Sequence, residues 1–203
     1  MSPVDRVLKA LAENQLLLKQ DKSVPNVVSI LTGESLRTSW WSHPKAHFIF
    51  AVLSKLADHP DVLFAKLVCG KDTMIHRSLW PAVLAVGRAR EPWQAQGLSD
   101  GAKRVLERLD REEGSVRAVG APVRELEKRL LATSREIHTE GGRHEMALES
   151  WQAWAARVRC RPAASVPQAR KTLEEAAIGL GAPLDALPWQ GRNAGSVRQY
   201  GRS

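Results

Sequence analysis

Apolar residues recur at helical spacing near the start of the chain. The apolar positions between residues 3 and 18 share one helical face, which predicts an amphipathic helix over this range. A second, short helix is expected from Val24-Pro25 onward. Gly33 should end it, because glycine readily adopts the left-handed conformation found after helices.

A third helix is expected after the aromatic pair Trp40-Trp41. Ser42 suits the N-cap of this helix, and Pro44 suits its first turn. The helix should end before Pro60, because proline disfavours helical backbone in the preceding residue. The run Phe48-Ile49-Phe50 is so apolar that this helix is expected to be mostly buried.

Strand-forming residues then replace the helical pattern. Residues 62–68 and 73–76 are rich in β-formers and flank the turn Gly70-Lys71-Asp72, so the pattern predicts a hairpin. A fourth helix is expected from Leu79. Residues 1–90 therefore predict one unit, called here the first unit, in which helices precede a hairpin.

The same order recurs later in the chain. Residues 91–97 break every period and are expected to be a linker. Ser99 should cap a helix, and Pro122 should begin another, where its missing N–H is not needed. Gly141-Gly142 can form the tight turn of a second hairpin. Residues 98–156 thus predict a second unit with helices followed by a hairpin.

The remaining chain predicts one helix and a tail. Over residues 157–189, Ser165 and Gln168 form a capping pattern at the start of a helix. The Leu187-Pro188-Trp189 run could dock on the body as an anchor. Residues 190–203 are rich in Gly, Arg and Ser without apolar periodicity, so we expect a disordered tail.

Composition and charge indicate the class of partner but not its identity. The 203 residues carry a formal net charge of +8 with a pI of about 9.9, which favours an anionic partner such as nucleic acid, with simple solubility as the alternative. Cys69 and Cys160 are far apart, as expected in a reducing cytosol. No signal-peptide pattern and no apolar run of ~18 residues is seen, so we expect a cytoplasmic protein without a membrane partner.

The repeated order of helices and hairpin resembles the winged-helix DNA-binding superfamily. The resemblance covers most of residues 3–156 by pattern and implies an α+β, mostly helical fold. The expected architecture is two winged-helix-like units plus a C-terminal helix. Such proteins place a helix in the major groove of duplex DNA while the hairpin touches the backbone.

On a chain of bacterial appearance, tandem winged helices also resemble the winged-helix DNA glycosylases. Those enzymes carry a Gln-x-Gln or Gln-x-Asp catalytic motif, which Gln94-Ala95-Gln96 matches. Here the tripeptide lies in the Pro-Trp linker, and the chain is about half as long as such an enzyme. We therefore expect the two glutamines to be structural and the protein to be non-catalytic.

The candidate DNA contacts are basic residues on the helices and hairpins of both units. Those of the second unit are Arg124, Lys128, Arg129, Arg135 and Arg143, and those of the first unit are Lys45, Lys66, Lys71 and Arg77. The alternative is a solvated basic face, because acidic residues such as Glu125 and Glu127 are interleaved with these cations.

Two further features are candidate sites. Trp40 and Trp41 could stack unpaired bases, although such a pair is more often core on one side and interface on the other. His43 and His47 share a helix face, but no third ligand lies at metal spacing, so neither a metal nor another cofactor is expected.

The sequence therefore predicts a double-stranded DNA-binding protein without catalysis. The alternatives are a protein–protein adaptor on the same scaffold and a glycosylase-like repair enzyme that uses Gln94 and Gln96. The oligomeric state cannot be inferred from these patterns.

Overall fold

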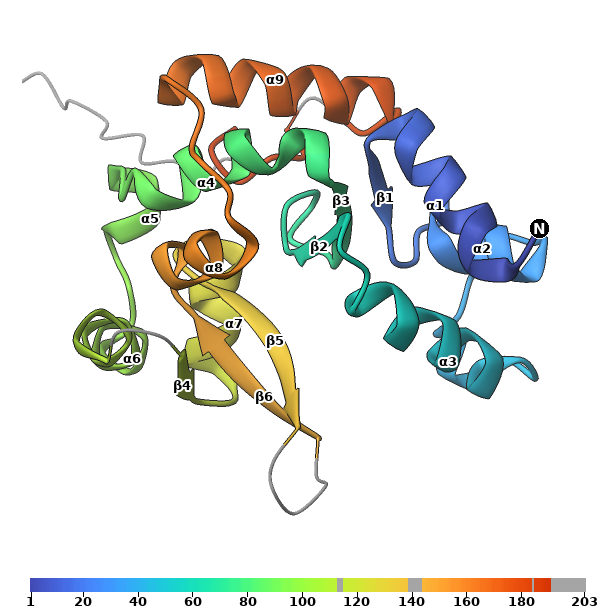
Figure 1. Ribbon diagram of the computed structural model, residues 1–203, viewed down its shortest axis with the longest axis horizontal. Helices are drawn as coiled ribbons and strands as arrows, with labels where there is room; N and C mark the ends of the chain where they lie inside the picture. The colour runs from blue at the N-terminus through green and yellow to red at the C-terminus, as the bar shows by residue number, and fades with distance from the viewer. Residues whose placement is uncertain (113–114, 139–143, 184, 191–203) are drawn as a thin grey trace, which may run out of the picture.

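The computed structural model describes residues 1–112, 115–138, 144–183 and 185–190 (Figure 1). The fold is α+β and mostly helical, as the sequence predicts. Two small antiparallel sheets of three strands each form its β-structure. One sheet lies in the first unit and the other in the second.

The first unit combines several helices with its three-stranded sheet. Strand β3 is central, and the strand order is β1-β3-β2. In chain order the elements are α1 (Pro3–Asn14), β1 (Leu16–Leu18), α2 (Val27–Thr32), the 3-10 turn η1 (Trp40–Ser42), α3 (Ala46–Ala57), β2 (Val62–Ala65), β3 (Thr73–His76), the 3-10 turn η2 (Arg77–Leu79) and α4 (Trp80–Arg88).

Local capping explains where the first helices begin and end. Ser2 caps α1 with a hydrogen bond from the Asp5 amide, and Gln15 ends it in the left-handed conformation. The prediction of one helix over residues 3–18 was therefore wrong at its end. Leu16–Leu18 instead form β1, because all three leucines are buried and pair with β3.

The second unit has a sheet with longer hairpin strands and the equivalent strand order, β4-β6-β5. The expected linker contains a short helix, and a further helix follows the hairpin; neither was predicted. The elements are α5 (Pro92–Ala95), α6 (Asp100–Arg111), β4 (Ser115–Arg117), α7 (Ala121–Lys128), β5 (Thr133–His138), β6 (His144–Glu149) and α8 (Trp151–Val158). The expected turn at Gly141-Gly142 lies outside the described residues.

Helix α9 (Val166–Gly179) packs along α4 at the top of Figure 1. Ser165 caps it through the Gln168 amide, as the sequence predicts. Leu187 is buried, and the Trp189 indole donates a hydrogen bond to Glu174 at 2.7 Å, so this segment anchors on the body. The expected tail beyond Gln190 lies outside the described residues.

The hydrophobic core has two parts of unequal size. The larger part fills the first unit and continues through α4, α8 and α9. The smaller part, in the second unit, comprises Leu98, Ala102, Leu109, Val116, Val123, Leu126, Leu131, Ala132 and Leu148. Helix α3 is less buried than expected, since Phe48 is 38% and Phe50 is 51% exposed.

Candidate functional site: a cleft between the two sheets

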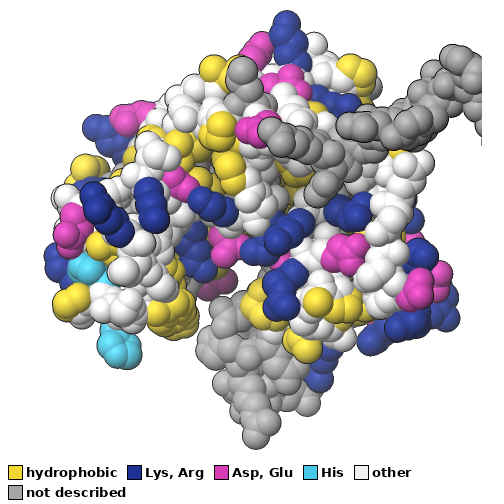
Figure 2. Space-filling view, turned by 180° about the vertical axis from the view of Figure 1, so that it is seen from behind, with side chains coloured by type: hydrophobic (Ala, Val, Ile, Leu, Met, Phe, Trp, Pro, Cys, Tyr) yellow, Lys and Arg dark blue, Asp and Glu magenta, His cyan; other side chains and the backbone are white. Residues whose placement is uncertain are grey.

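A cleft of about 480 Å³ lies between the first and second units. Helix α3 and strand β2 line it on one side, and β5, β6 and α8 line it on the other. The space-filling view shows the surface hollowed between the units, with hydrophobic and charged side chains around the hollow (Figure 2). The cleft therefore joins side chains that are distant in sequence.

The aromatic wall of the cleft is built from η1 and α3. Trp40 is buried, whereas Trp41 is 61% exposed, and their ring centroids lie 3.9 Å apart at an interplanar angle of 26°. Phe50 continues the row, with its ring 5.7 Å from that of Trp41. Buried Trp40 thus supports Trp41, whose ring remains accessible in the cleft.

Two hydrogen bonds and a cation fix this aromatic wall. The Trp40 amide donates to the side chain of Gln20 at 3.2 Å, and the His43 amide closes η1 by donating to the Trp40 carbonyl. The Lys19 ammonium lies 5.8 Å from the centroid of the Trp40 ring. A cation at this distance is attracted to the face of the ring.

The opposite wall contains a carboxylate shared by two arginines. Arg157 on α8 binds Glu149 at the end of β6 with two hydrogen bonds, of 3.0 and 2.7 Å. Arg135 on β5 lies 3.8 Å from the same carboxylate. The Glu149 side chain is only 4% exposed. Hydrogen bonding to Glu149 raises the pKa of Arg157, although partial burial opposes this rise.

A second shared carboxylate lies beneath the aromatic wall. Asp72 accepts hydrogen bonds from Lys66 at 2.5 Å and from Lys19 at 3.5 Å. Burial acts to raise the pKa of Asp72, but the hydrogen bond from Lys66 and the two positive charges outweigh it and hold the pKa below its ordinary value. Asp72 therefore stays ionised and orients both lysines.

The charges that line the cleft balance. The cations are Lys19, Lys66, Arg135 and Arg157, and the carboxylates are Asp58, Asp72, Glu127 and Glu149. Such a site cannot attract an anion strongly through net charge. It offers instead the accessible aromatic ring of Trp41 and guanidinium N–H groups that are not used by Glu149. These features suit a flat ligand that carries an anionic group.

Helix α7 borders the cleft and carries two of the predicted DNA contacts. Glu127 lines the cleft, while Arg124, three residues earlier, is exposed. The Arg124 guanidinium makes no hydrogen bond or ion pair within the part of the chain that the structure describes. The exposed Lys128 extends its carbon chain along Gly70 of the first unit.

Arg129, also a predicted DNA contact, holds the backbone of residues 93–97. Its guanidinium donates to the carbonyl groups of Trp93, Gln94 and Gln96 at 3.1, 3.3 and 2.6 Å. These bonds satisfy carbonyl groups at the end of α5, where helical partners are lacking. Arg129 therefore holds α5 against α7, and its contact with DNA stays a prediction.

Gln94 and Gln96 have different environments. The Gln94 side chain is fully buried, donates to the carbonyls of Arg129 and Leu130 at 3.2 and 3.3 Å, and accepts from the Glu91 amide at 2.9 Å. Gln96 is exposed. Neither lines the cleft. The carboxamide of Gln94 is thus engaged by the backbone at the end of α7.

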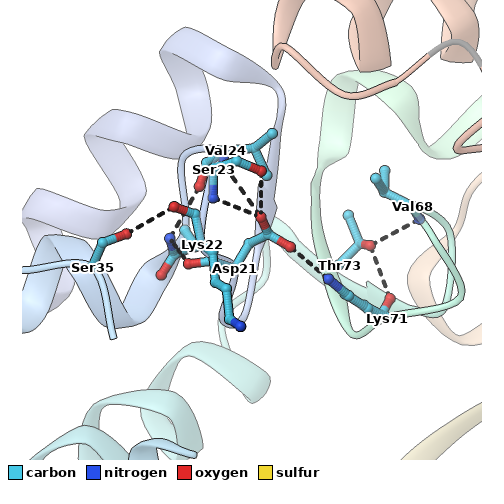
Figure 3. A network of polar contacts seen from close by, with 9 residues as sticks. Asp21, Lys22, Ser23, Val24, Ser35, Val68, Lys71 and Thr73 are labelled. Atoms are coloured by element: carbon cyan, nitrogen blue, oxygen red, sulfur yellow. Dashed lines mark hydrogen bonds and ion pairs between the residues drawn. The ribbon is translucent and has the colours of Figure 1, made fainter. Parts of the chain in front are cut away.

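Lys71 in the β2–β3 turn is also engaged within the protein. Its ammonium lies 2.6 Å from the carboxylate of Asp21, which in turn accepts hydrogen bonds from Ser23 and Val24 (Figure 3). Burial acts to raise the pKa of Asp21, but the hydrogen bonds from Lys71 and Ser23 lower it well below its usual range. Lys71 therefore ties this turn to the loop after β1, and its contact with DNA stays a prediction.

The other predicted site residues are dispersed. Arg77 pairs with Asp61 at 3.0 Å, and Lys45 is exposed at the start of α3. Arg143 lies outside the described residues. His43 contacts Glu34 at 3.1 Å. Within the described ranges, no three His, Cys, Asp or Glu side chains come close enough together to hold a metal ion.

Sequence reasoning identified Trp41, Lys66 and Arg135 but missed the residues that join them. Glu149 and Arg157 come from β6 and α8, and their pairing depends on the unpredicted helix α8. One available signal was Glu149 itself, an acidic residue at the end of the apolar strand pattern, followed by Trp151 and Trp154.

Comparison with known proteins gives no relative for this arrangement. No known family, no curated protein and no solved structure matches the chain. No helix among the described residues combines the length and apolar character that crossing a membrane requires. Any functional conclusion therefore depends on the geometry of the site itself.

Proposed function

We propose that the protein binds duplex DNA through the second unit. Helix α7 would enter the major groove, and the β5–β6 hairpin would lie along the phosphate backbone. The observation that carries this proposal is the exposed Arg124, whose guanidinium has no partner among the described residues, on the helix directly before the hairpin. The exposed Lys128 lies on the same helix. The net charge of +8 is consistent with an anionic partner.

The shared topology of the units supports a winged-helix interpretation. In each unit a helix and a short strand precede further helix and a hairpin, and the last strand pairs with both others. The second unit reaches this arrangement with fewer helices between its first strand and its hairpin. Because both units have the same strand order, we infer that they share one architecture. That architecture is the winged-helix pattern which the sequence resembles.

The first unit is less suited to contact DNA. Its α3, directly before the first hairpin, exposes Phe48 and Phe50, and the hairpin turn is occupied by contacts of Lys71 and Gly70 inside the protein. Aromatic side chains cannot neutralise phosphates, which supply most of the affinity of DNA-binding proteins. We therefore assign duplex binding to the second unit alone.

Fluorescence anisotropy of a labelled duplex at several salt concentrations tests this proposal. Arg124→Ala should weaken binding by about 5- to 100-fold if the side chain reaches a base edge, or lower the salt slope by ~0.9 if it reaches a phosphate. The matched control is Arg6→Ala, which removes an equally exposed arginine from α1. Equal effects of both variants, or no affinity of the wild type, would refute the assignment.

A protein–protein adaptor is the second candidate. The exposed aromatic side chains Trp41, Phe48 and Phe50 favour it, because aromatic residues are enriched at the centres of protein interfaces. If the protein does not bind duplex DNA at low salt, the adaptor function becomes the better proposal.

A further inference from the structure

We propose that the cleft between the units receives an unpaired nucleobase, so that the preferred ligand is a duplex with an adjoining single strand. This inference rests on the proposed function, since α7 would hold the duplex part. It assigns a second nucleic-acid site, centred on Trp41, to the same molecule.

Trp41 presents an accessible ring to the cleft. The residue is 61% exposed, lines the cleft and stacks with a centroid distance of 3.9 Å on the buried Trp40. A ring that is already fixed in position loses little side-chain entropy when a ligand stacks on it. Every base offers a π-face, so such a platform accepts unpaired bases of any sequence.

The cleft also holds guanidinium donors, on the wall across from this ring. Arg157 uses Nε and Nη2 to bind Glu149, and its Nη1 has no hydrogen bond within the described residues. Arg135 shares the same carboxylate, and both side chains are more than 40% exposed, at 41% and 44%. Guanidinium groups that are oriented in this way can donate to the phosphate attached to a stacked base.

The balanced charge of the cleft distinguishes this ligand from a duplex. A protein that binds duplex DNA neutralises several phosphates at once, which requires an excess of cations. The cleft has as many carboxylates as cations. Its affinity must therefore come mainly from stacking, with one or two phosphate contacts, as expected for a short unpaired segment.

Helix α7 provides continuity between the two sites. Glu127 lines the cleft, and Arg124 lies one turn earlier on the same helix. A strand that leaves a duplex bound at α7 would thus meet the cleft directly. A protein segment would fit the exposed aromatic side chains too, but it would use the remaining donors of Arg157 only if it placed an acidic side chain beside them, whereas every nucleotide of a strand brings its own phosphate.

The experiment compares a paired duplex with the same duplex that carries a single-stranded extension, in which 2-aminopurine replaces one base. The wild type should bind the extended duplex more tightly, and 2-aminopurine fluorescence should fall as the base stacks. Trp41→Ala should abolish the quenching and remove on the order of 10- to 100-fold of the affinity for the extended duplex, but leave affinity for the paired duplex unchanged.

Phe48→Ala is the matched control, because Phe48 is an exposed aromatic residue on α3 that does not line the cleft. It should change neither signal. Arg157→Gln should weaken binding of the extended duplex and lower the salt slope by ~0.7, the value for one single-strand contact.

Failure of this inference differs from failure of the proposed function. If paired and extended duplexes bind equally and 2-aminopurine is not quenched, the cleft is not a base site, whereas the duplex proposal stands. If the paired duplex does not bind but 2-aminopurine in the extended duplex and in the single strand alone is quenched in a Trp41-dependent manner, the cleft inference stands without its duplex part. If the paired duplex, the extended duplex and the single strand all fail to bind, both proposals are overturned.

Discussion

The two hairpins share one strand order but differ in what surrounds them. The turn of the β2–β3 hairpin is held from three directions: Asp21 pairs with Lys71, the Cys69 amide donates to the Ala186 carbonyl at 2.7 Å, and Lys128 lies along Gly70. The β5–β6 hairpin extends away from the body (Figure 1), where Arg135 and Met146 are exposed. The first hairpin thus organises the fold, and the second is available for a ligand.

The difference shows why basic residues on similar elements need not have similar roles. Lys71 and Arg129 satisfy internal acceptors, whereas Arg124 has no partner among the described residues. The packing around each element, more than its type, decides which cations remain available. Three stability predictions and one binding measurement test this division.

The contact that packs α8 of the second unit into the larger core should have the largest effect on stability. Trp151 is buried, packs edge-on against Trp154, and donates to the Leu130 carbonyl at 2.7 Å. Trp151→Ala should lower the free energy of unfolding by about 3–5 kcal/mol, as for other buried tryptophans. Urea denaturation measures this. A loss below ~1 kcal/mol would mean that the two units are not joined through this side chain.

The buried Gln94 should have the next largest effect. Gln94→Ala leaves the carbonyls of Arg129 and Leu130 and the Glu91 amide without these bonds, at a cost of about 1–3 kcal/mol. Gln96→Ala, at an exposed position, should change the free energy of unfolding by less than about 0.5 kcal/mol. Thermal denaturation of both variants provides the measurement. Release of bases from alkylated duplex by the wild type, lost in both variants, would instead indicate a catalytic pair.

The Asp21–Lys71 ion pair should contribute least, because Lys71 is half exposed. Asp21→Asn should cost about 1 kcal/mol at neutral pH. Since the folded-state pKa of Asp21 is depressed, its contribution is present above the ordinary pKa of ~3.9 and is lost as pH falls through the lower folded value. The difference between wild type and variant should therefore shrink as the pH falls below about 4. A difference that stays constant from neutral pH into acid would contradict an electrostatic origin.

Local patterns were sufficient for much of the fold. The starts of two helices were predicted correctly from the capping residues Ser99 and Ser165. The first hairpin was predicted correctly from the strand-forming residues Thr73–His76. Each of these signals is contained within a few consecutive residues. The three-residue strands β1 and β4 were missed, since each is a strand only through pairing with a distant partner. Such pairings are not encoded in local periodicity.

The candidate site was predictable only in fragments. Trp41 and Arg135 were identified by residue type, but their common cleft depends on how the β5–β6 hairpin faces α3. The exposure of Phe50 was missed because an apolar run resembles a buried helix when its neighbours are unknown. Which cations were already engaged also depended on tertiary contacts, as Arg129 illustrates.

Hydrogen exchange of the protein with and without a paired duplex tests the central claim most directly. The division of roles predicts that DNA slows exchange of backbone amides in α7 and β5 and leaves α3 and the β2–β3 turn unchanged. The measurement reads both units in one sample, so each is the control for the other. Slower exchange in α3 and the β2–β3 turn, without change in α7 and β5, would contradict the assignment of DNA binding to the second unit.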